Sequence, residues 1–228
     1  MSHSLLHLKR LGLYLSDRWL FRDLNLTIPR ASFVAITGPS GVGKTSLLRL
    51  LAKDLAPTEG TIDASLLSGQ MNTSTIFQDL QLANGASTLT NALSGCLGRH
   101  SALRTFFGFP QKEIDKSTEW LARFGLQTHS RQWASTLSRG ERQRLAICRT
   151  LLSSPTLLLA DEPVASLDAD WANRTLHILK DTQRSVNGSV ICTLHDEDQV
   201  QKFADFVLRL DPENALNWSW EKISDFEE

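Results

Sequence analysis

The chain has 228 residues, of which 41% are hydrophobic and 21% are charged. This composition is that of an ordinary globular protein with enough length for a sizeable core, which excludes a disordered or fibrous chain. Twenty-four lysines and arginines against 25 aspartates and glutamates leave a formal net charge of −1, so no basic excess is available for a nucleic acid backbone and we expect no nucleic acid partner.

The first quarter of the chain predicts three strands, a glycine loop and a helix. The apolar runs Leu11–Leu15 and Leu24–Ile28 bracket a turn-like Ser16-Asp17-Arg18, which indicates an antiparallel hairpin. A third strand, Phe33–Thr37, leads into the glycine loop, and Ser46–Leu55 then carries leucines at helical spacing.

Farther along, glycines punctuate short helical stretches between about residues 78 and 136, and we expect an inserted, mostly helical subdomain there. Alternating strands and helices on both sides of it predict an α/β fold with a parallel sheet. The acidic tail carries Trp218 and Trp220, which by default pack on the core. The remaining predicted elements are a helix at Glu113–Phe124, a helix from near Ser138, a strand at Leu157–Ala160, a helix at Ala172–Gln183, a strand at Ser189–Leu194 and a last strand at Phe206–Leu210.

Residues 38–45 fit the Walker A pattern Gly-x-x-x-x-Gly-Lys-Thr. In this pattern the glycines let backbone N–H groups wrap phosphates, and the following helix directs its positive end at them. The alternative is a glycine turn with only a structural role, but the flanking strand and helix are those that a phosphate loop needs. We expect Lys44 to reach the β- and γ-phosphates and the Thr45 hydroxyl to hold Mg²⁺. The predicted nucleotide-binding residues are Gly38, Pro39, Ser40, Gly41, Val42, Gly43, Lys44, Thr45 and Ser46.

The apolar run Leu157–Ala160 ends in Asp161 and Glu162. Ligands of α/β sheets bind at the carboxyl ends of strands, where these two carboxylates point in different directions. We expect Asp161 to enter the Mg²⁺ shell as the Walker B acid and Glu162 to polarise the attacking water. An exposed acidic turn is the alternative.

Five further segments, in order, make the sequence resemble the ATPase subunit of ABC transporters. Tyr14, on a strand edge, matches the aromatic residue that stacks on adenine, and Gln78 matches the Q-loop glutamine that touches Mg²⁺ and the attacking water. Leu137–Glu141, with the letters LSRGE, stands in place of the signature LSGGQ, and Ser166–Asp168 in place of the D-loop. His195 matches the switch histidine that contacts the γ-phosphate. Singly, the aromatic, the glutamine and the histidine are each explained by ordinary packing or exposure, but the ordered set is not.

The resemblance implies a P-loop NTPase (RecA-like) core with a parallel sheet, an N-terminal antiparallel β subdomain and an inserted α-helical subdomain. We expect a single ABC-type ATP-binding domain over residues 1–228. Its core covers about 1–78 and 157–211, its helical subdomain with the signature about 79–156, and its acidic tail 212–228. The cofactors implied are ATP and Mg²⁺, with Thr45, Gln78 and Asp161 as metal-binding residues and Glu162, His195, Gln78 and Lys44 as catalytic residues.

The signature predicts a second copy of the chain as a partner. Ser138 is a candidate N-cap for a helix whose Leu145, Cys148 and Leu152 share an apolar face, so the N-terminal donors of this helix face an anion. In the family that anion is the γ-phosphate of ATP bound to the other subunit, which implies a head-to-tail homodimer around two nucleotides. The nucleotide contacts implied on this side are Ser138, Arg139, Gly140, Glu141 and Asp168.

Two residues depart from the family signature, because Arg139 replaces its first glycine and Glu141 its glutamine. Arg139 adds a charge beside a phosphate site and puts the turnover rate, rather than nucleotide binding, in question. Its guanidinium either approaches the partner's nucleotide, or points to solvent or pairs with Glu141 or Glu162. For the basic residues Arg142, Arg144 and Arg149 on the same helix we expect a solvated or carboxylate-paired face.

The segments Thr90–Arg99, Phe106–Pro110 and Ala160–Asp168 are similar to the ATPase subunits of phosphonate importers. This similarity implies transmembrane permease subunits as partners, a substrate-binding protein as an indirect partner, and a peripheral position on the cytoplasmic face of the inner membrane. The alternatives are the ATPase of an exporter or of a lipoprotein-extraction transporter, and a soluble ABC ATPase of translation or DNA repair. The last kind usually has two such domains or a long coiled-coil insertion, for which this chain is too short.

Cysteine use and hydrophobic runs agree with a cytosolic chain. Cys96, Cys148 and Cys192 are far apart and show no Cys-x-x-Cys spacing, so we expect neither a zinc site nor a disulfide framework. Charge at Lys9 and Arg10 interrupts the first apolar stretch too early for a secretion signal, and no run reaches the roughly 18 apolar residues of a membrane span.

Overall fold

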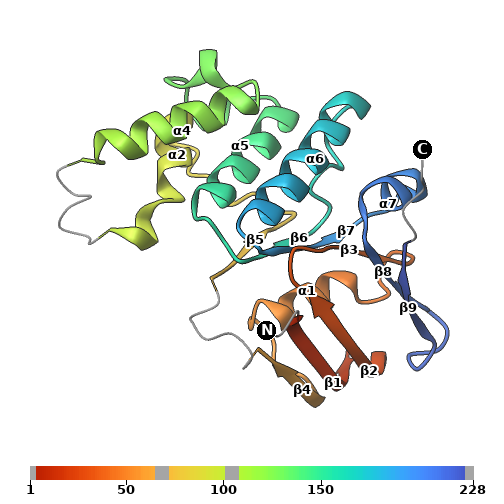
Figure 1. The fold of residues 1–228 in the computed structure, drawn as a ribbon. Coiled ribbons are helices and arrows are strands. Elements are labelled where there is room, and N and C mark those ends of the chain that lie inside the picture. The colour runs from red at the N-terminus through yellow and green to blue at the C-terminus, as the bar shows by residue number, and fades with distance from the viewer. Residues whose placement is uncertain (1–3, 65–71, 101–107, 224–228) are drawn as a thin grey trace. The chain divides into compact units, whose positions relative to one another are not determined.

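The computed structural model describes residues 4–64, 72–100 and 108–223 (Figure 1). The chain forms two compact units, the first made of residues 1–75, 156–162 and 176–228 and the second of residues 76–155 and 163–175. Phe106 and Phe107, which belong to one of the segments similar to phosphonate importers, lie outside the described residues, as does the end of the tail at 224–228. In the described part of the chain, no helix is long and apolar enough to span a bilayer.

The predicted strands and helices are present, and their ends are shifted by a few residues in most cases. The strands are β1 (Ser4–Leu15), β2 (Arg18–Pro29), β3 (Phe33–Thr37), β4 (Glu59–Asp63), β5 (Thr73–Ile76), β6 (Leu157–Ala160), β7 (Ser189–Thr193), β8 (Phe206–Leu210) and β9 (Trp218–Lys222). The helices are α1 (Lys44–Leu51), α2 (Thr88–Ser94), α4 (Gln111–Arg123), α5 (Arg139–Leu152), α6 (Ala169–Ser185) and α7 (Glu197–Phe203), with short 3₁₀ turns at Leu97–Arg99, Gln127–His129 and Ala134–Thr136.

A three-stranded antiparallel sheet in the first unit has the order β2-β1-β4. The predicted hairpin is confirmed, with Leu13 opposite Phe21 and the turn at Ser16 and Asp17. Along β2 buried and exposed residues alternate, as expected for a sheet with one face on a core. β1 is the middle strand of this sheet, and Tyr14 is its second-last residue.

The second sheet of this unit positions the functional site. Its order is β5-β6-β7-β3-β8-β9, and β6, β7, β3 and β8 run parallel to their neighbours in that series. All five residues of β3 are buried, which explains its continuous apolar sequence. Because parallel strands end at the same edge, the residues that follow β3, β6 and β7 are brought together there.

Helix α1 joins the two sheets through one core. Leu47, Leu48 and Leu51 are at most 3% exposed and belong to one buried cluster with side chains of β1, β2, β3 and β6. Removing one of these leucine side chains would cost about 2–5 kcal/mol of the free energy of unfolding. The phosphate loop therefore leads into a helix that is firmly anchored.

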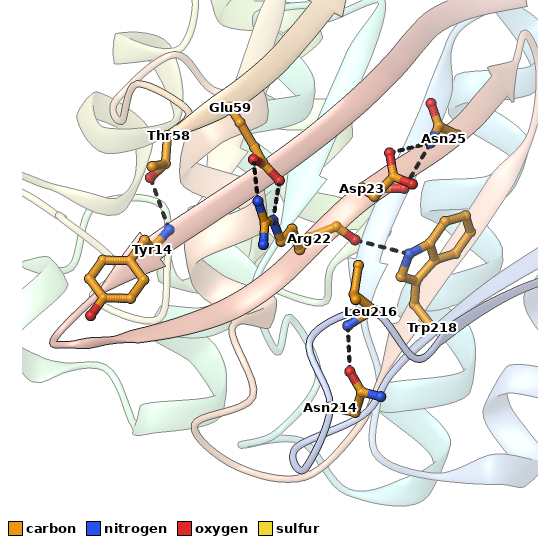
Figure 2. Close-up of polar contacts among 9 residues, drawn as sticks. All are labelled: Tyr14, Arg22, Asp23, Asn25, Thr58, Glu59, Asn214, Leu216 and Trp218. Carbon is orange, nitrogen blue, oxygen red and sulfur yellow. Dashed lines mark hydrogen bonds and ion pairs between the residues drawn. The ribbon is translucent and has the colours of Figure 1, made fainter.

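The tail corrects one prediction, because Phe206–Leu210 is followed by a further strand, β9, paired antiparallel with β8. The Trp220 ring stacks on Phe206 with centroids 5.2 Å apart. The Trp218 indole N–H donates to the carbonyl of Arg22 at 3.2 Å, as Figure 2 shows. The packing of both tryptophans on the core is thus confirmed. Their period-2 spacing in Trp-Ser-Trp-Glu-Lys was the overlooked strand pattern.

In the second unit α2, α4 and α5 pack together around fully buried side chains such as Leu121, Phe124 and Cys148. The apolar face predicted for the helix after Ser138 is confirmed, since Leu145 and Leu152 are also fully buried. The three cysteines are buried and unpaired, and burial raises the pKa of the thiols of Cys96, Cys148 and Cys192.

Arg142, Arg144 and Arg149 of α5 were predicted to be solvated or paired with carboxylates, but each of them donates to a carbonyl or amide oxygen of the second unit. Arg144 donates to the carbonyl of Phe124 at 2.7 Å and lies 4.0 Å above the Trp171 ring. Arg149 donates to the carbonyls of Leu80 and Gln81. These carbonyls lie at the C-terminal end of α4 and in the loop after β5, where no strand pairs with them, and the guanidinium groups satisfy them. Arg142 likewise donates to the side-chain oxygen of Asn84 at 3.0 Å.

Candidate functional site

The predicted phosphate loop connects β3 to α1. Gly38, Gly41 and Gly43 have φ values of 137, 77 and 114°, which residues with a side chain rarely adopt. A Cβ on Gly38 would also lie only 2.7 Å from the carbonyl oxygen of Leu210. The glycines are therefore required by the backbone path itself, and α1 begins directly after them at Lys44.

Lys44 is 7% exposed, and its ammonium donates to the carbonyl oxygens of Gly38 at 2.7 Å and Pro39 at 3.0 Å. Burial lowers the pKa of Lys44, and the charges of Glu162 and Asp161 oppose this shift. The cation is thus held inside the loop by oxygen atoms that phosphate oxygens could replace.

Asp161 is the buried centre of the site, at 6% exposure. Its Oδ2 accepts a hydrogen bond from the Thr45 hydroxyl at 2.8 Å, and its Oδ1 accepts one from the Thr193 hydroxyl at 2.9 Å. The end of β6, the start of α1 and the end of β7 therefore meet at one carboxylate. The structure brings together the two first-unit residues predicted to bind Mg²⁺.

Glu162 turns away from Asp161, as predicted, and its Oε1 lies 2.7 Å from Nε2 of His195. The Glu162 backbone has a φ of 48°, a left-handed conformation that is costly for a residue with a side chain. Its N–H donates to the Thr193 hydroxyl at 2.7 Å. This bond helps to hold the glutamate in its strained position, at the carboxyl edge of the sheet.

The donor set fits Mg²⁺. Hydroxyl and carboxylate oxygens from Thr45 and Asp161 are hard ligands, and Mg²⁺ commonly binds through one or two protein oxygens plus substrate phosphates and water. No group of three or more histidine, cysteine and acidic side chains that could hold a metal by itself occurs in the described ranges. Substrate phosphates and water would complete the coordination.

Tyr14 lies at the end of β1 and is 44% exposed, so it is not a core aromatic. Figure 2 shows its N–H bonded to the Thr58 hydroxyl, at 2.9 Å, and its ring projecting from the strand. The ring meets the edge of the Trp19 ring with centroids 5.4 Å apart. Arg18, the first residue of β2, donates to the carbonyl of Gly41 at 2.6 Å and so ties the hairpin to the phosphate loop.

A groove of about 1080 Å³ also lies on the antiparallel sheet, and its lining includes Arg10, Arg22, Asp23, Glu59 and Leu216. Arg22 and Glu59 form an ion pair across it at 2.8 Å. Its lining contains none of the predicted nucleotide-binding residues.

The signature belongs to the second unit and begins helix α5. Ser138 and Glu141 form a capping box, in which the Ser138 hydroxyl accepts from the N–H of Glu141 and the Glu141 carboxylate accepts from the N–H of Ser138 at 2.8 Å. These hydrogen bonds to Ser138 lower the pKa of Glu141, and His129, 3.4 Å away, adds to the shift. The family's glutamine is thus replaced by a residue that can form the same cap.

Two neighbouring positions of the signature differ in the space around them. A Cβ on Gly140 would lie 3.2 Å from the carbonyl oxygen of Ser166 in the D-loop, whereas Arg139 is exposed. Arg139 forms no hydrogen bond or ion pair within the described part of the chain, and Glu141 is engaged in its cap. Of the alternatives stated for Arg139, pairing with Glu141 is therefore not observed. Position 139 has open space for a side chain, whereas a side chain at position 140 would crowd the carbonyl of Ser166.

The other predicted residues of this unit are exposed. The Asp168 carboxylate accepts from the N–H of Trp171 at 2.8 Å and so caps the first turn of α6. Gln78 is the second residue after β5 and is exposed. Four residues that the sequence analysis missed, Arg18, Trp19, Thr58 and Thr193, support the predicted ones in the first unit. Only a polar residue at the end of an otherwise apolar strand, as at Thr193, could have been noticed in the sequence.

A phosphate loop at the carboxyl edge of a parallel sheet, faced by an acidic residue from a neighbouring strand, is the arrangement of P-loop NTPases. The family model described as "ABC transporter" matches residues 21–165, which is well over half of the described chain. The chain belongs to the ABC transporter family and is an ATPase of that family. One solved relative, an inward-facing putative metal-chelate type ABC transporter, superimposes with a TM-score of 0.82 over 100% of this chain and 86% of its own, at 25% identity. The predicted fold class is confirmed.

Two curated relatives cover most of this chain. The phosphite import ATP-binding protein PxtA of Stutzerimonas stutzeri is 35% identical over 198 residues, covering 83% of this chain and 72% of its own. The phosphonates import ATP-binding protein PhnC 2 of Pseudomonas savastanoi pv. phaseolicola is 37% identical over 216 residues, covering 87% and 78%. The resemblance to the ATPase subunits of phosphonate importers is thus confirmed.

Proposed function

We propose that the chain hydrolyses MgATP to drive an ABC importer of phosphonate, phosphite or a related oxyanion. It works as a peripheral subunit on the cytoplasmic face of the inner membrane, bound to transmembrane permease subunits that receive cargo from a substrate-binding protein. The observation that carries the ATPase site is the connected set Thr45, Asp161, Glu162 and His195 at one sheet edge. The cargo class rests on similarity to the phosphite and phosphonate import proteins.

Catalysis at this edge is positioning combined with electrostatics. Lys44 and the loop N–H groups stabilise negative charge on the β- and γ-phosphates. Thr45 and Asp161, with Gln78, hold Mg²⁺, which when bound neutralises charge on the phosphate oxygens. Glu162 orients the attacking water and accepts its proton. His195, already within hydrogen-bonding distance of Glu162, contacts the γ-phosphate.

The active species is a head-to-tail homodimer. The capped N-terminus of α5 leaves backbone donors of the signature free to meet an anion, and its Ser138, Gly140 and Glu141 act on ATP held by the other copy. Asp168 of the D-loop contributes to the same contact with the nucleotide of the other copy. The chain functions as one ATP-binding domain, in which residues 163–175 belong to the second compact unit and the tail residues belong to the first.

Transport in reconstituted vesicles tests this proposal. The chain is purified with its permease subunits, placed in proteoliposomes containing ATP, Mg²⁺ and an ATP-regenerating system, and supplied outside with substrate-binding protein and radiolabelled phosphite or 2-aminoethylphosphonate. We expect accumulation that requires ATP and Mg²⁺ and is absent with EDTA. ATP hydrolysis without uptake of either compound would reject the cargo class, and export of a preloaded compound would favour the exporter alternative.

A further inference from the structure

The hydroxyl of Thr193 links the two acidic residues of the proposed ATPase site. Thr193 is the last residue of β7 and is only 1% exposed. Its Oγ1 lies 2.9 Å from Oδ1 of Asp161 and 2.7 Å from the backbone nitrogen of Glu162. A hydroxyl has one proton to donate and lone pairs to accept, so it can make both bonds at once.

Each bond fixes a different catalytic property. The bond to Oδ1 fixes the rotation of the Asp161 carboxylate, so that Oδ2 faces the Thr45 hydroxyl at 2.8 Å. The bond from the Glu162 N–H holds a peptide whose φ of 48° is unfavourable for glutamate. From that peptide the Glu162 side chain reaches His195 at 2.7 Å.

We propose that Thr193 is a positioning residue that couples the Mg²⁺ side of the site to its proton-accepting side. This inference rests on the roles proposed above for Asp161 and Glu162. Through one buried hydroxyl, Thr193 keeps the acid that faces Thr45 and the base that orients water in a fixed mutual geometry. Partners that orient a metal ligand in this way typically contribute about 10-fold to 100-fold in metal affinity or activity.

Thr193→Val tests the role, because valine has the shape of threonine without the hydroxyl. Asp161 Oδ1 and the Glu162 N–H would lose their partner, and we expect kcat to fall about 10-fold to 100-fold with KM for ATP changed less than about threefold. Binding of a fluorescent ATP analogue should be unchanged in EDTA, whereas the Mg²⁺ concentration needed for half-maximal binding should rise about 10-fold. Thr193→Ser keeps the hydroxyl and should restore both values to within about threefold.

Thr175→Val is the matched control. Thr175 is also fully buried, on α6, and its hydroxyl has no hydrogen-bond partner within the described residues. The Thr175→Val variant undergoes the same chemical change as Thr193→Val, and it should leave kcat and the Mg²⁺ dependence unchanged. If Thr193→Val does not fold, as judged by its thermal melting curve, Thr193→Cys replaces it, since a thiol is a weak donor of similar size.

The outcomes separate this inference from the proposed function. A wild-type protein without MgATP hydrolysis would contradict the proposed function itself. An active wild type together with a Thr193→Val or Thr193→Cys variant that matches the Thr175→Val control would overturn the role of Thr193 alone. The role would also be overturned if affinity in EDTA fell as much as kcat, or if Thr193→Ser failed to restore turnover, because the residue would then be merely structural.

Discussion

The sheet-edge site of the first unit and the signature of the second are organised in opposite ways. At the sheet edge the functional groups bind one another, from Thr45 through Asp161 to Thr193 and from Glu162 to His195. In the signature the polar groups bind their own helix, since Glu141 caps α5 and Asp168 caps α6. At the sheet edge the side chains already hold one another in position. In the signature they only cap their own helices, so its exposed surface is left for a ligand that the same unit does not supply.

This difference explains why the two regions tolerate different changes. A substitution at the sheet edge disturbs neighbours for which we propose catalytic roles, so we expect a large effect on turnover. A substitution in the signature that preserves the caps changes only the exposed surface at the start of α5, where we propose that the other subunit binds. Arg139 is such a substitution, because it adds a cation without disturbing the Ser138–Glu141 cap.

The largest expected effect is at Glu162, and ATP hydrolysis without this residue would contradict the difference drawn between the two regions. Glu162→Gln keeps a group that can hydrogen-bond water and His195 but cannot accept a proton. We expect steady-state ATP hydrolysis to fall about 100-fold or more, with ATP affinity retained and the closed dimer accumulating. Phosphate release and size-exclusion chromatography in ATP measure the two effects. Turnover near that of the wild type would transfer the role of base to Gln78 or His195.

A smaller effect, on ATP affinity, is expected at Tyr14, the residue proposed to stack on adenine. Tyr14→Ala removes an exposed ring, so stacking on adenine should be lost at a cost of about 1 kcal/mol, or about fivefold in ATP affinity. Affinity for inorganic triphosphate, which has no base, serves as the control and should not change. Equal loss for both ligands, or a lower melting temperature at unchanged affinity, would argue against stacking.

Arg139 tests the signature side. If its free guanidinium meets the partner's nucleotide, Arg139→Gly should weaken ATP-induced dimerisation several-fold and raise steady-state turnover, because the dimer reopens faster. Analytical ultracentrifugation in ATP and an ATPase assay at several protein concentrations report both. Unchanged rate and unchanged dimerisation would leave Arg139 as a solvated side chain.

The smallest expected effect is on stability and concerns the Glu141 carboxylate that caps α5. Because the pKa of Glu141 is lowered in the folded protein, its contribution to the free energy of unfolding is complete above the unfolded pKa of about 4.3 and is lost as the pH falls through the folded value. Glu141→Gln keeps an oxygen acceptor but does not titrate. Urea unfolding of both proteins from pH 6 to 3 should show a stability difference of about 1 kcal/mol or less that shrinks on acidification. A difference independent of pH would exclude a role for the charge.

Much of the sheet edge could be predicted because its residues follow strands and a loop with strong local patterns. The order of Phe33–Thr37, the glycines and Lys44 determines the phosphate loop almost without tertiary information. The partners Arg18 and Thr193 could not be predicted, since they reach the site only after distant segments pair in the sheet. The predictions for Arg142, Arg144 and Arg149 failed for a related reason, because their oxygen partners lie in other segments of the chain, 20 to 69 residues away.

Strand β9 forms one border of the six-stranded sheet, and a bare sheet border can recruit strands from other molecules. It ends in Glu221 and Lys222, both exposed, and the opposite border, β5, is only four residues long. β9 therefore covers the edge of β8, and Trp220 covers Phe206, which protects both from edge-to-edge association. A chain cut before Trp218 would keep every residue of the ATPase site and yet be prone to aggregate.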